Sequence, residues 1–256
     1  MVAMAHQPDP VLRLLWRHGL DDDRTGPRRG RRQSLSVDDV VDAAIKVADR
    51  DSLDALTMRG LAGELGIGAM SVYTYVPGRD ELLALMADQA LGRRTLPPMP
   101  DDVRERLALV ARTHYETCSE HPWLLDAMVL QNGIGPGASD LYEWQLSAVE
   151  GIGLTDLEMD QAVAVLAGFA GNIARSQVRM RAAERASGMS EAEWWEANAP
   201  ELGRLTAGRR YPLADRVGQA AGQAYQASAD PAAELEFGLA RIIDGIVTYT
   251  EGRPRG

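Results

Sequence analysis

The sequence predicts an all-α protein in which a small N-terminal helical bundle is joined to a larger C-terminal one. Apolar residues recur at the three- and four-residue spacing of a buried helix face, and no segment alternates as a half-buried strand does. Turn signals such as Gly66-Ile67-Gly68, Pro77-Gly78 and Asp230-Pro231 separate the periodic segments. With 45% hydrophobic and 25% charged residues, the composition is that of a globular protein and excludes a fibrous or wholly unfolded chain.

Four helices are predicted in the N-terminal part. Ser36 and Asp39 form a capping pattern before a first helix that ends near Asp51. Thr57 caps a short second helix that stops at Gly66, and a third helix carries Ala69, Val72 and Val76 inward. The fourth helix, over residues 79–91, follows Pro77-Gly78 and buries Leu82, Leu83, Met86 and Ala90. We expect this domain to span residues 34–94.

The stretch TLPPMP, residues 95–100, is the clearest linker in the sequence, and a second helical domain is expected over residues 101–251. Helices are predicted there at residues 101–119, 122–130, 139–150, 156–186, 190–202, 213–227 and 231–250. The longest nearly apolar stretch, residues 162–174, is shorter than the roughly 20 residues that cross a bilayer. With no secretory signal and a single cysteine, Cys118, we expect a cytoplasmic protein.

Charge is distributed unevenly along the chain. The net charge is −10, but residues 1–94 hold 13 basic and 14 acidic residues, against 14 and 23 in the remainder. Residues 24–32 contain five arginines and no acid, and residues 1–33 are expected to be a flexible basic extension with one short helix at Val11–Trp16. Arginine runs are electrostatic footprints for phosphate, so DNA contacts are expected from this arm as an alternative to a merely solvated tail. The residues concerned are Arg28, Arg29, Arg31 and Arg32.

The second and third helices, with the glycine turn between them, indicate a helix-turn-helix, whose second helix enters the major groove of DNA. With Val72 and Val76 directed to the core, the third helix has an outward face of Met70, Ser71, Tyr73, Thr74 and Tyr75. Tyrosine and hydroxyl side chains of this kind bind phosphates and base edges. The alternative is that either tyrosine packs against a neighbouring helix.

Residues 56–86, LTMRGLAGELGIGAMSVYTYVPGRDELLALM, resemble the DNA-binding signature of the TetR/AcrR transcriptional regulators, and the resemblance extends over residues 34–91. It implies a phosphate-binding cap at Thr57, a guanine-reaching Arg59 and a basic residue, Arg79, at the start of the fourth helix. It also implies groove-facing residues at Ala69, Met70, Ser71 and Thr74, and aromatic contacts from Tyr73 and Tyr75. Val76 stands where many members carry Phe, and the small residues that lead the reading helix leave the operator sequence open.

The C-terminal part resembles the family in its helix count, in the HPWL sequence at residues 121–124 and in its closing helix. In the family that helix pairs with an earlier long helix across a twofold axis, so the resemblance implies a homodimer. The alternative is that the same face is the core of a single chain. The expected dimer residues are Leu235, Gly238, Leu239, Ile242, Ile243, Gly245 and Ile246.

Aromatic, sulfur-containing and polar residues on otherwise apolar helices are the candidates for an effector pocket. We expect most of them to be core, and Asn172 and Arg175 to be the most informative because they interrupt or follow the longest apolar stretch. The candidates are His114, Tyr115, Cys118, Trp123, Met128, Gln131, Trp144, Phe169, Asn172, Arg175, Ser176 and Trp194.

His114, Cys118 and His121 are spaced to lie on one face of a helix, which makes part of a zinc or nickel site one interpretation. A buried Cys118 with two hydrogen-bonded histidines is the preferred interpretation, and no metal or cofactor is expected. The sequence has no hydrolase, nucleotide-binding or metalloprotease motif, so we expect no enzyme. The predicted function is a ligand-responsive repressor that binds a palindromic operator as a dimer, with a small-molecule effector as its third partner. The alternative is a constitutive regulator or architectural protein without an effector.

Overall fold

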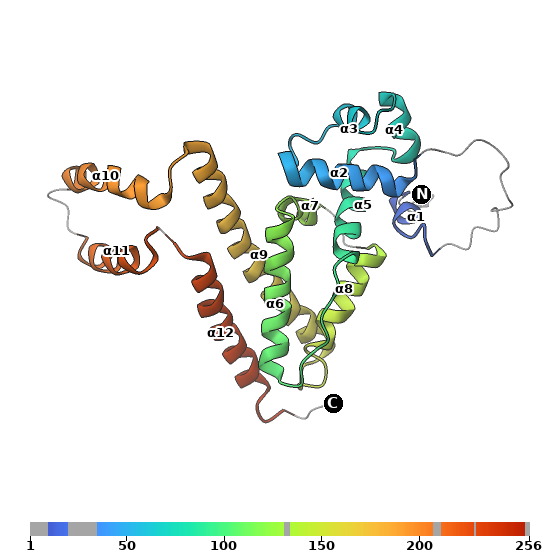
Figure 1. The fold of residues 1–256 in the computed structure, drawn as a ribbon. Coiled ribbons are helices and arrows are strands. Elements are labelled where there is room, and N and C mark those ends of the chain that lie inside the picture. The colour runs from blue at the N-terminus through green and yellow to red at the C-terminus, as the bar shows by residue number, and fades with distance from the viewer. Residues whose placement is uncertain (1–9, 20–34, 131–133, 207–210, 228, 254–256) are drawn as a thin grey trace, which may run out of the picture.

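The computed structural model describes residues 10–19, 35–130, 134–206, 211–227 and 229–253. Within these ranges every regular element is a helix, which confirms the predicted all-α class (Figure 1). The helices are α1 (Val11–Leu15), α2 (Val37–Asp51), α3 (Met58–Glu64), α4 (Ala69–Tyr75), α5 (Arg79–Gly92), α6 (Val103–Glu120), α7 (Leu124–Leu130), α8 (Pro136–Ser147), α9 (Asp156–Ser187), α10 (Glu191–Thr206), α11 (Pro212–Tyr225) and α12 (Pro231–Thr250).

Helix α2 begins and ends where its sequence predicts. The Ser36 side chain accepts the backbone N–H of Asp39, and the Asp39 carboxylate accepts the N–H of Ser36, which satisfies two amides at the start of the helix. The predicted apolar face is buried at Val40, Val41, Ala44, Ile45 and Ala48. This face forms the first core together with α3, α4 and α5.

Helix α1, which the sequence places in a flexible extension, is part of the first core. Val11 and Leu15 are buried, and α1 packs against α5. The Arg17 guanidinium pairs with the Asp38 carboxylate of α2 and donates to the Gln89 side chain of α5. A short helix is predicted at Val11–Trp16 and is found at Val11–Leu15, but it packs into the first core and is not a flexible segment.

Helix α5 is buried on every side rather than along the single predicted face. In addition to the four predicted residues, Ala84, Leu85, Ala87 and Leu91 are buried. The reason is that α1, α2, α7 and α8 all pack against it, and a helix covered all round needs apolar residues all round.

Helices α5 and α8 cross at two glycines. A Cβ on Gly92 would lie 3.1 Å from the Gly137 Cα, so neither position has room for a side chain. One turn away, the half-buried Asp88 carboxylate accepts the N–H of Ala138 at 2.9 Å, at the start of α8. Burial raises the pKa of Asp88 above its ordinary value. Pro136 at the first position of α8 explains why the helix begins earlier than the predicted residue 139.

Helix α7 belongs to the first core although it follows the first helix of the C-terminal domain. Trp123, Leu124 and Ala127 are buried among the residues of α2 and α5. The first core therefore extends beyond the predicted domain limits of 34 and 94 in both directions.

The second core lies between α6, α9 and α12, with α8 packed on α9 (Figure 1). The 32-residue α9 starts with a capping box between Thr155 and Glu158 and ends at Gly188 in the left-handed conformation. Its inward residues, including Val163, Leu166 and Ala170, meet Leu107 of α6 and Leu239 of α12. No helix in the described part of the chain is long and apolar enough to cross a membrane.

Helices α10 and α11 extend beyond the ends of α9 and α12, away from α5 and α8 (Figure 1). Neither helix has a buried residue, and Leu205, Leu213 and Val217 are all more than half exposed. Helix α10 continues to Thr206, beyond the predicted end near residue 202, and contains Pro200. These two helices present most of their apolar surface to solvent in the single chain.

Candidate functional site

The helix-turn-helix forms at the outer edge of the first core (Figure 1). Thr57 caps α3 by accepting the N–H of Gly60 at 3.0 Å, and Leu61 is buried. The turn then passes through Gly66, whose φ of +65° is a left-handed conformation that favours glycine. Both the cap and the turn lie where the sequence predicts them.

The outward face of α4 is open to solvent, as expected for a reading helix. Val72 and Val76 are fully buried, whereas Met70 is 78% exposed and Tyr73 is 43% exposed. Ser71 and Thr74 are exposed beside them. Ala69, which we expected both on the inward side and among the groove-facing residues, is exposed and so lies outward.

Tyr75 differs from the prediction of two exposed tyrosines. It is partly buried and packs against the first core, so only part of its ring surface faces solvent. Tyr75 is the last residue of α4, where the helix turns back towards the core at Val76. The packing alternative that we considered for either tyrosine therefore applies to Tyr75 and not to Tyr73.

Two of the predicted cationic contacts flank this face. Arg59 is exposed in the first turn of α3, and Arg79 is exposed at the first residue of α5. One Arg79 nitrogen donates to the backbone oxygen of Leu53 at 3.0 Å, which orients the side chain and leaves further N–H donors. Asp80 and Glu81 follow in the same turn, so the start of α5 carries both signs of charge.

The reading helix itself contributes no charge, because α4 has the sequence AMSVYTY. Nearby, Arg50 is engaged by Asp51 and Glu64, both at 2.7 Å. Among the cationic residues predicted to contact DNA, Arg59 and Arg79 are the ones that the structure describes, and both are exposed. Arg28, Arg29, Arg31 and Arg32 lie outside the described residues, in the connection between α1 and α2.

Three effector candidates meet in a closely packed cluster on α6 and α9. The Cys118 sulfur lies 3.6 Å from His114 Nε2, and a Cβ on Gly171 would lie 3.3 Å from that same nitrogen. Tyr115, partly buried, packs beside Cys118. Burial lowers the pKa of His114 and raises that of Cys118 to about 11, so both groups are neutral near pH 7.

The remaining effector candidates do not converge on one cavity. Asn172, which we expected to need a partner in the apolar stretch, is exposed, because that stretch is one face of a helix whose other face is open. Arg175 is satisfied within the chain by Asp126 at 2.7 Å and by the backbone oxygen of Leu125 at 2.5 Å. Ser176 is partly buried next to it, and Phe169 packs on Gly238.

Two tryptophan candidates serve other contacts. Trp123 is buried in the first core, and Trp144 donates its indole N–H to the backbone oxygen of Pro97 at 2.8 Å, which fixes the linker on α8. Both make packing contacts in this structure, and neither lines the two pockets at α10 described next. Gln131 and the side chain of Met128 lie outside what the structure describes.

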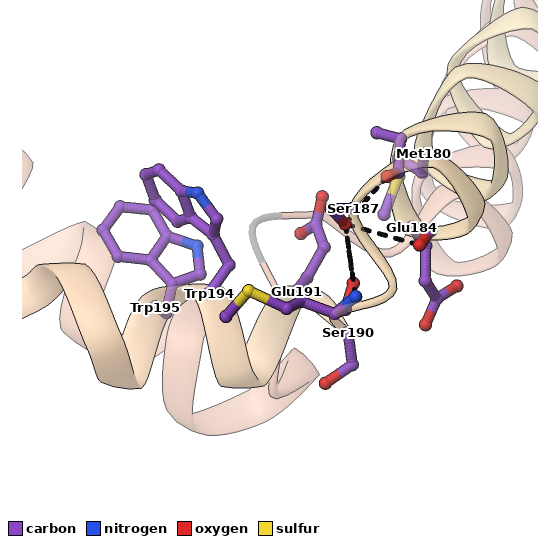
Figure 2. Close-up of a pocket in the computed structure, with 9 residues that line it drawn as sticks. Met180, Glu184, Ser187, Ser190, Glu191, Trp194 and Trp195 are labelled. Atoms are coloured by element: carbon purple, nitrogen blue, oxygen red, sulfur yellow. Dashed lines mark hydrogen bonds between the residues drawn. The ribbon is translucent and has the colours of Figure 1, made fainter.

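Trp194 does line a pocket, at the corner between α9 and α10. Figure 2 shows Trp194 and Trp195 on one side and Met180 with the end of α9 on the other, around a volume of about 360 Å³. The two indole rings meet edge to face, with centroids 5.3 Å apart. A larger pocket of about 780 Å³ lies between α10 and α11 and includes Trp195 and Tyr211. Neither pocket holds any of the other effector candidates.

The expected dimer residues of α12 divide into two groups. Leu235, Leu239 and Ile243 are buried in the chain's own core, and Ile242 and Ile246 pack against it, because the most apolar face of α12 covers α6 and α9. Gly238 admits the Phe169 ring of the same chain. Gly245 is open, since a Cβ there would meet nothing within 4 Å. Most of the predicted dimer residues thus contact the chain's own core, whereas Gly245 is exposed.

The potential metal ligands separate in the structure. His121 Nδ1 lies 2.8 Å from the Asp49 carboxylate, whereas His114 faces Cys118. Among the described residues, no three His, Cys, Asp or Glu side chains are placed to hold a metal ion.

Residues 96–250 match the protein domain described as "Tetracyclin repressor-like, C-terminal domain". The chain belongs to the tetracycline-repressor family of transcriptional regulators. It is 38% identical over 238 residues to the HTH-type transcriptional repressor DrrR1 of Streptomyces coeruleorubidus, covering 92% of this chain and 84% of that repressor.

Solved structures agree with this family assignment. Apo ActR from Streptomyces coelicolor superposes with a TM-score of 0.67 at 26% identity, over 84% of this chain and 96% of ActR. ActR in complex with actinorhodin gives a TM-score of 0.68 at 26% identity, over 86% and 99% of the two chains. As in other members of the tetracycline-repressor family, an N-terminal helix-turn-helix precedes a helical C-terminal domain in this chain.

Proposed function

We propose that this tetracycline-repressor family member is a ligand-responsive repressor, which binds a palindromic operator as a homodimer and releases it when a small molecule binds the C-terminal domain. It acts through binding and not through catalysis. The observation that carries the proposal is the outward face of α4. Met70, Ser71, Tyr73 and Thr74 are exposed together on a helix whose opposite face is anchored by the fully buried Val72.

That face suits the major groove for a chemical reason. Hydroxyl groups at Ser71, Tyr73 and Thr74 donate to or accept from phosphates and base edges, and the Met70 side chain covers thymine methyl groups. Arg59, one helix earlier, has the planar donor pair that recognises a guanine edge. The similarity to the DrrR1 repressor supports repression as the outcome of binding.

The dimer surface that we propose lies on the outer sides of α9 and α12, which pack side by side. On α9, Leu157, Val165 and Gly168 are exposed at helical spacing. On α12, Phe237, Arg241, Gly245 and Tyr249 follow one another every four residues, and all are exposed. Phe237 is 68% exposed, and exposed apolar residues that gather on neighbouring helices are typical of an interface.

The two open glycines give a direct test of this surface. Gly168 and Gly245 have no atom within 4 Å of a built Cβ, so leucine at either position fits the single chain and improves helix propensity. At a helix–helix contact across the twofold axis, the same leucines would separate the two chains. We expect Gly168→Leu and Gly245→Leu to dissociate the dimer at micromolar concentration in sedimentation equilibrium.

Gly203→Leu is the matched control, because Gly203 is also a helical glycine without neighbours but lies in α10. Its sedimentation should match that of the unsubstituted protein. Operator affinity should fall with dimerisation in the first two variants, since one helix-turn-helix reads only a half-site. Unchanged dimers in both variants would contradict the proposed surface.

Effector control is supported by the structure of ActR with actinorhodin, a complex of a protein that shares this fold. The pockets at the α9–α10 corner and between α10 and α11 are the candidate places in this chain. The side chains around His114 and Cys118 are closely packed, so this cluster does not support effector binding there and agrees with a constitutive regulator.

Thermodynamic linkage between effector binding and operator binding decides between an effector-controlled and a constitutive regulator. The test titrates actinorhodin, and then any compound found by a thermal-shift screen, into the protein with and without operator DNA. A typical coupling of about 1–3 kcal/mol lowers ligand affinity about 5- to 150-fold when operator is bound. Equal ligand affinities in the two titrations would favour the constitutive regulator.

A further inference from the structure

The HPW sequence that follows α6 makes a contact across the two domains that the reading face and the dimer surface do not explain. Trp123 Nε1 donates to the Asp49 carboxylate at 2.7 Å, and His121 Nδ1 lies 2.8 Å from the same oxygen. Because an ionised carboxylate only accepts, this geometry requires the proton of a neutral His121 ring on Nδ1. We call these three side chains the Asp49 latch.

Burial and neighbouring contacts hold the three side chains of the Asp49 latch in place. The Trp123 ring is 3% exposed in the first core, and the rings of His121 and Trp123 are in tilted contact with centroids 5.8 Å apart. The side chains of Asp49 and His121 are 33% and 26% exposed. The backbone N–H of His121 donates to the Thr117 oxygen at 3.0 Å, which ties the turn to the last turn of α6.

The position of Asp49 gives the latch its significance. Asp49 lies at the end of α2, and the chain continues from there through a short turn into α3 and α4, which pack on α2. The other contacts between this domain and the C-terminal bundle in the described part of the chain are made by α5: it crosses α8 at Gly92 and Gly137, α7 packs against it, and Arg94 just beyond its end pairs with two carboxylates of α6. These contacts hold α5, whereas the Asp49 latch holds the end of α2, from which the chain continues into α3 and α4. The latch therefore opposes a rotation of the reading helices relative to α5.

We propose that Asp49 is a positioning residue, which fixes the orientation of the reading face relative to the dimer body and so sets the operator spacing that the protein accepts. This inference rests on the proposed function. Successive half-sites lie about 34–36 Å apart for each helical turn of 10–10.5 base pairs, so one inserted base pair shifts and rotates the second half-site by about one tenth of a turn. Only a rigidly oriented pair of reading faces rejects that change strongly.

The experiment uses the full chain and an operator enriched from random duplexes. Fluorescence anisotropy gives the Kd for that operator and for the same duplex with one base pair inserted between the half-sites. The quantity compared is the spacing ratio, which is the second Kd divided by the first. Because the latch joins a charged acceptor to two donors, we expect Asp49→Ala to lower the spacing ratio about 5- to 10-fold.

Two further substitutions separate positioning from charge. Asp51→Ala removes the same charge from the end of the same helix but contacts Arg50 and not the HPW turn, so its spacing ratio should stay that of the unsubstituted protein. Asp49→Asn keeps an acceptor oxygen without the charge and should give an intermediate ratio. If Asp49→Ala does not fold, His121→Ala removes one of the two donors and provides the same comparison.

The outcomes are distinct. A lower spacing ratio in Asp49→Ala, with a smaller further effect when His121→Ala is added, supports the latch, since residues that act as a unit are not additive. An unchanged ratio, with both Kd values raised equally, makes Asp49 a purely structural residue and overturns the latch alone. If the unsubstituted protein enriches no duplex, the proposed function fails and the latch fails with it.

Discussion

Leu15→Ala tests whether α1 belongs to the first core. Leu15 is 3% exposed and packs with Val11 against α5. A buried leucine truncated to alanine costs about 2–5 kcal/mol. A five-residue helix is not stable by itself, so the loss cannot exceed the docking free energy of α1. Burial of the two aliphatic side chains contributes about 3–6 kcal/mol to that docking free energy.

We therefore expect Leu15→Ala to lower the free energy of unfolding by about 2–3 kcal/mol, a large part of the roughly 5–15 kcal/mol of an ordinary domain. Urea unfolding followed by circular dichroism measures it. Arg13→Ala is the matched control, because Arg13 is exposed on the same helix and should change stability by no more than about 0.5 kcal/mol. A Leu15→Ala variant as stable as the control would refute the packing of α1.

Three other predictions concern separate parts of the molecule. Gly238→Ala should destabilise the fold by about 1–3 kcal/mol in urea unfolding, because its Cβ would overlap the Phe169 ring, and no loss would mean that the ring moves freely. The backbone N–H of Thr155 and the Tyr249 hydroxyl lower the pKa of Glu158 from 4.5 to about 2, so the stability that its carboxylate contributes is complete above pH 4.5 and is lost as the pH falls towards 2. Unfolding at pH 6 and pH 3 should show Glu158→Gln less stable than the unsubstituted protein by a larger margin at pH 6, and an equal difference at both values would contradict this. Alanine substitution of the arm, at Arg28, Arg29, Arg31 and Arg32, leaves α1 intact. It should reduce the slope of log affinity against log salt by about 0.9 for each DNA phosphate that the arginines neutralise. An unchanged slope would mean that the arm is only a solvated segment.

The local features of the reading domain were predictable because short-range chemistry determines them. The cap at Thr57, the left-handed Gly66 and the buried Val72 each follow from a residue type and its immediate neighbours. Tyr75 shows where this reasoning ends. Helical spacing places it outward, but α4 ends at that residue and the ring meets the core.

Long-range packing accounts for the larger departures. Neither the burial of Leu15 nor that of Trp123 in the first core follows from periodicity, since their partners lie in helices far along the chain. The same holds for α12, where an apolar face serves equally well as core or as dimer surface in the sequence. Its exposed residues, with Phe237 foremost, can be recognised only once α6 and α9 have covered the other side.

The effector site was the least predictable feature. Candidates were chosen as polar or aromatic residues in apolar helices, and that criterion also selects residues with structural partners. Trp144 on the Pro97 oxygen and Arg175 on Asp126 are both of this kind. Trp194 is the candidate that borders an open pocket, and it stands in a helix without a buried residue.

The central claim is that the outward side of α3 and α4 reads DNA, and one affinity comparison tests it most directly. Fluorescence anisotropy on the enriched operator compares the double variant Arg59→Ala, Tyr73→Ala with the double variant Arg216→Ala, Tyr225→Ala, which removes the same residue types from the exposed surface of α11. At about 1–3 kcal/mol for each contact, the first pair should lose about 30-fold or more in affinity while the second pair binds as the unsubstituted protein does. Full affinity in the Arg59→Ala, Tyr73→Ala protein would contradict the assignment of this face to DNA.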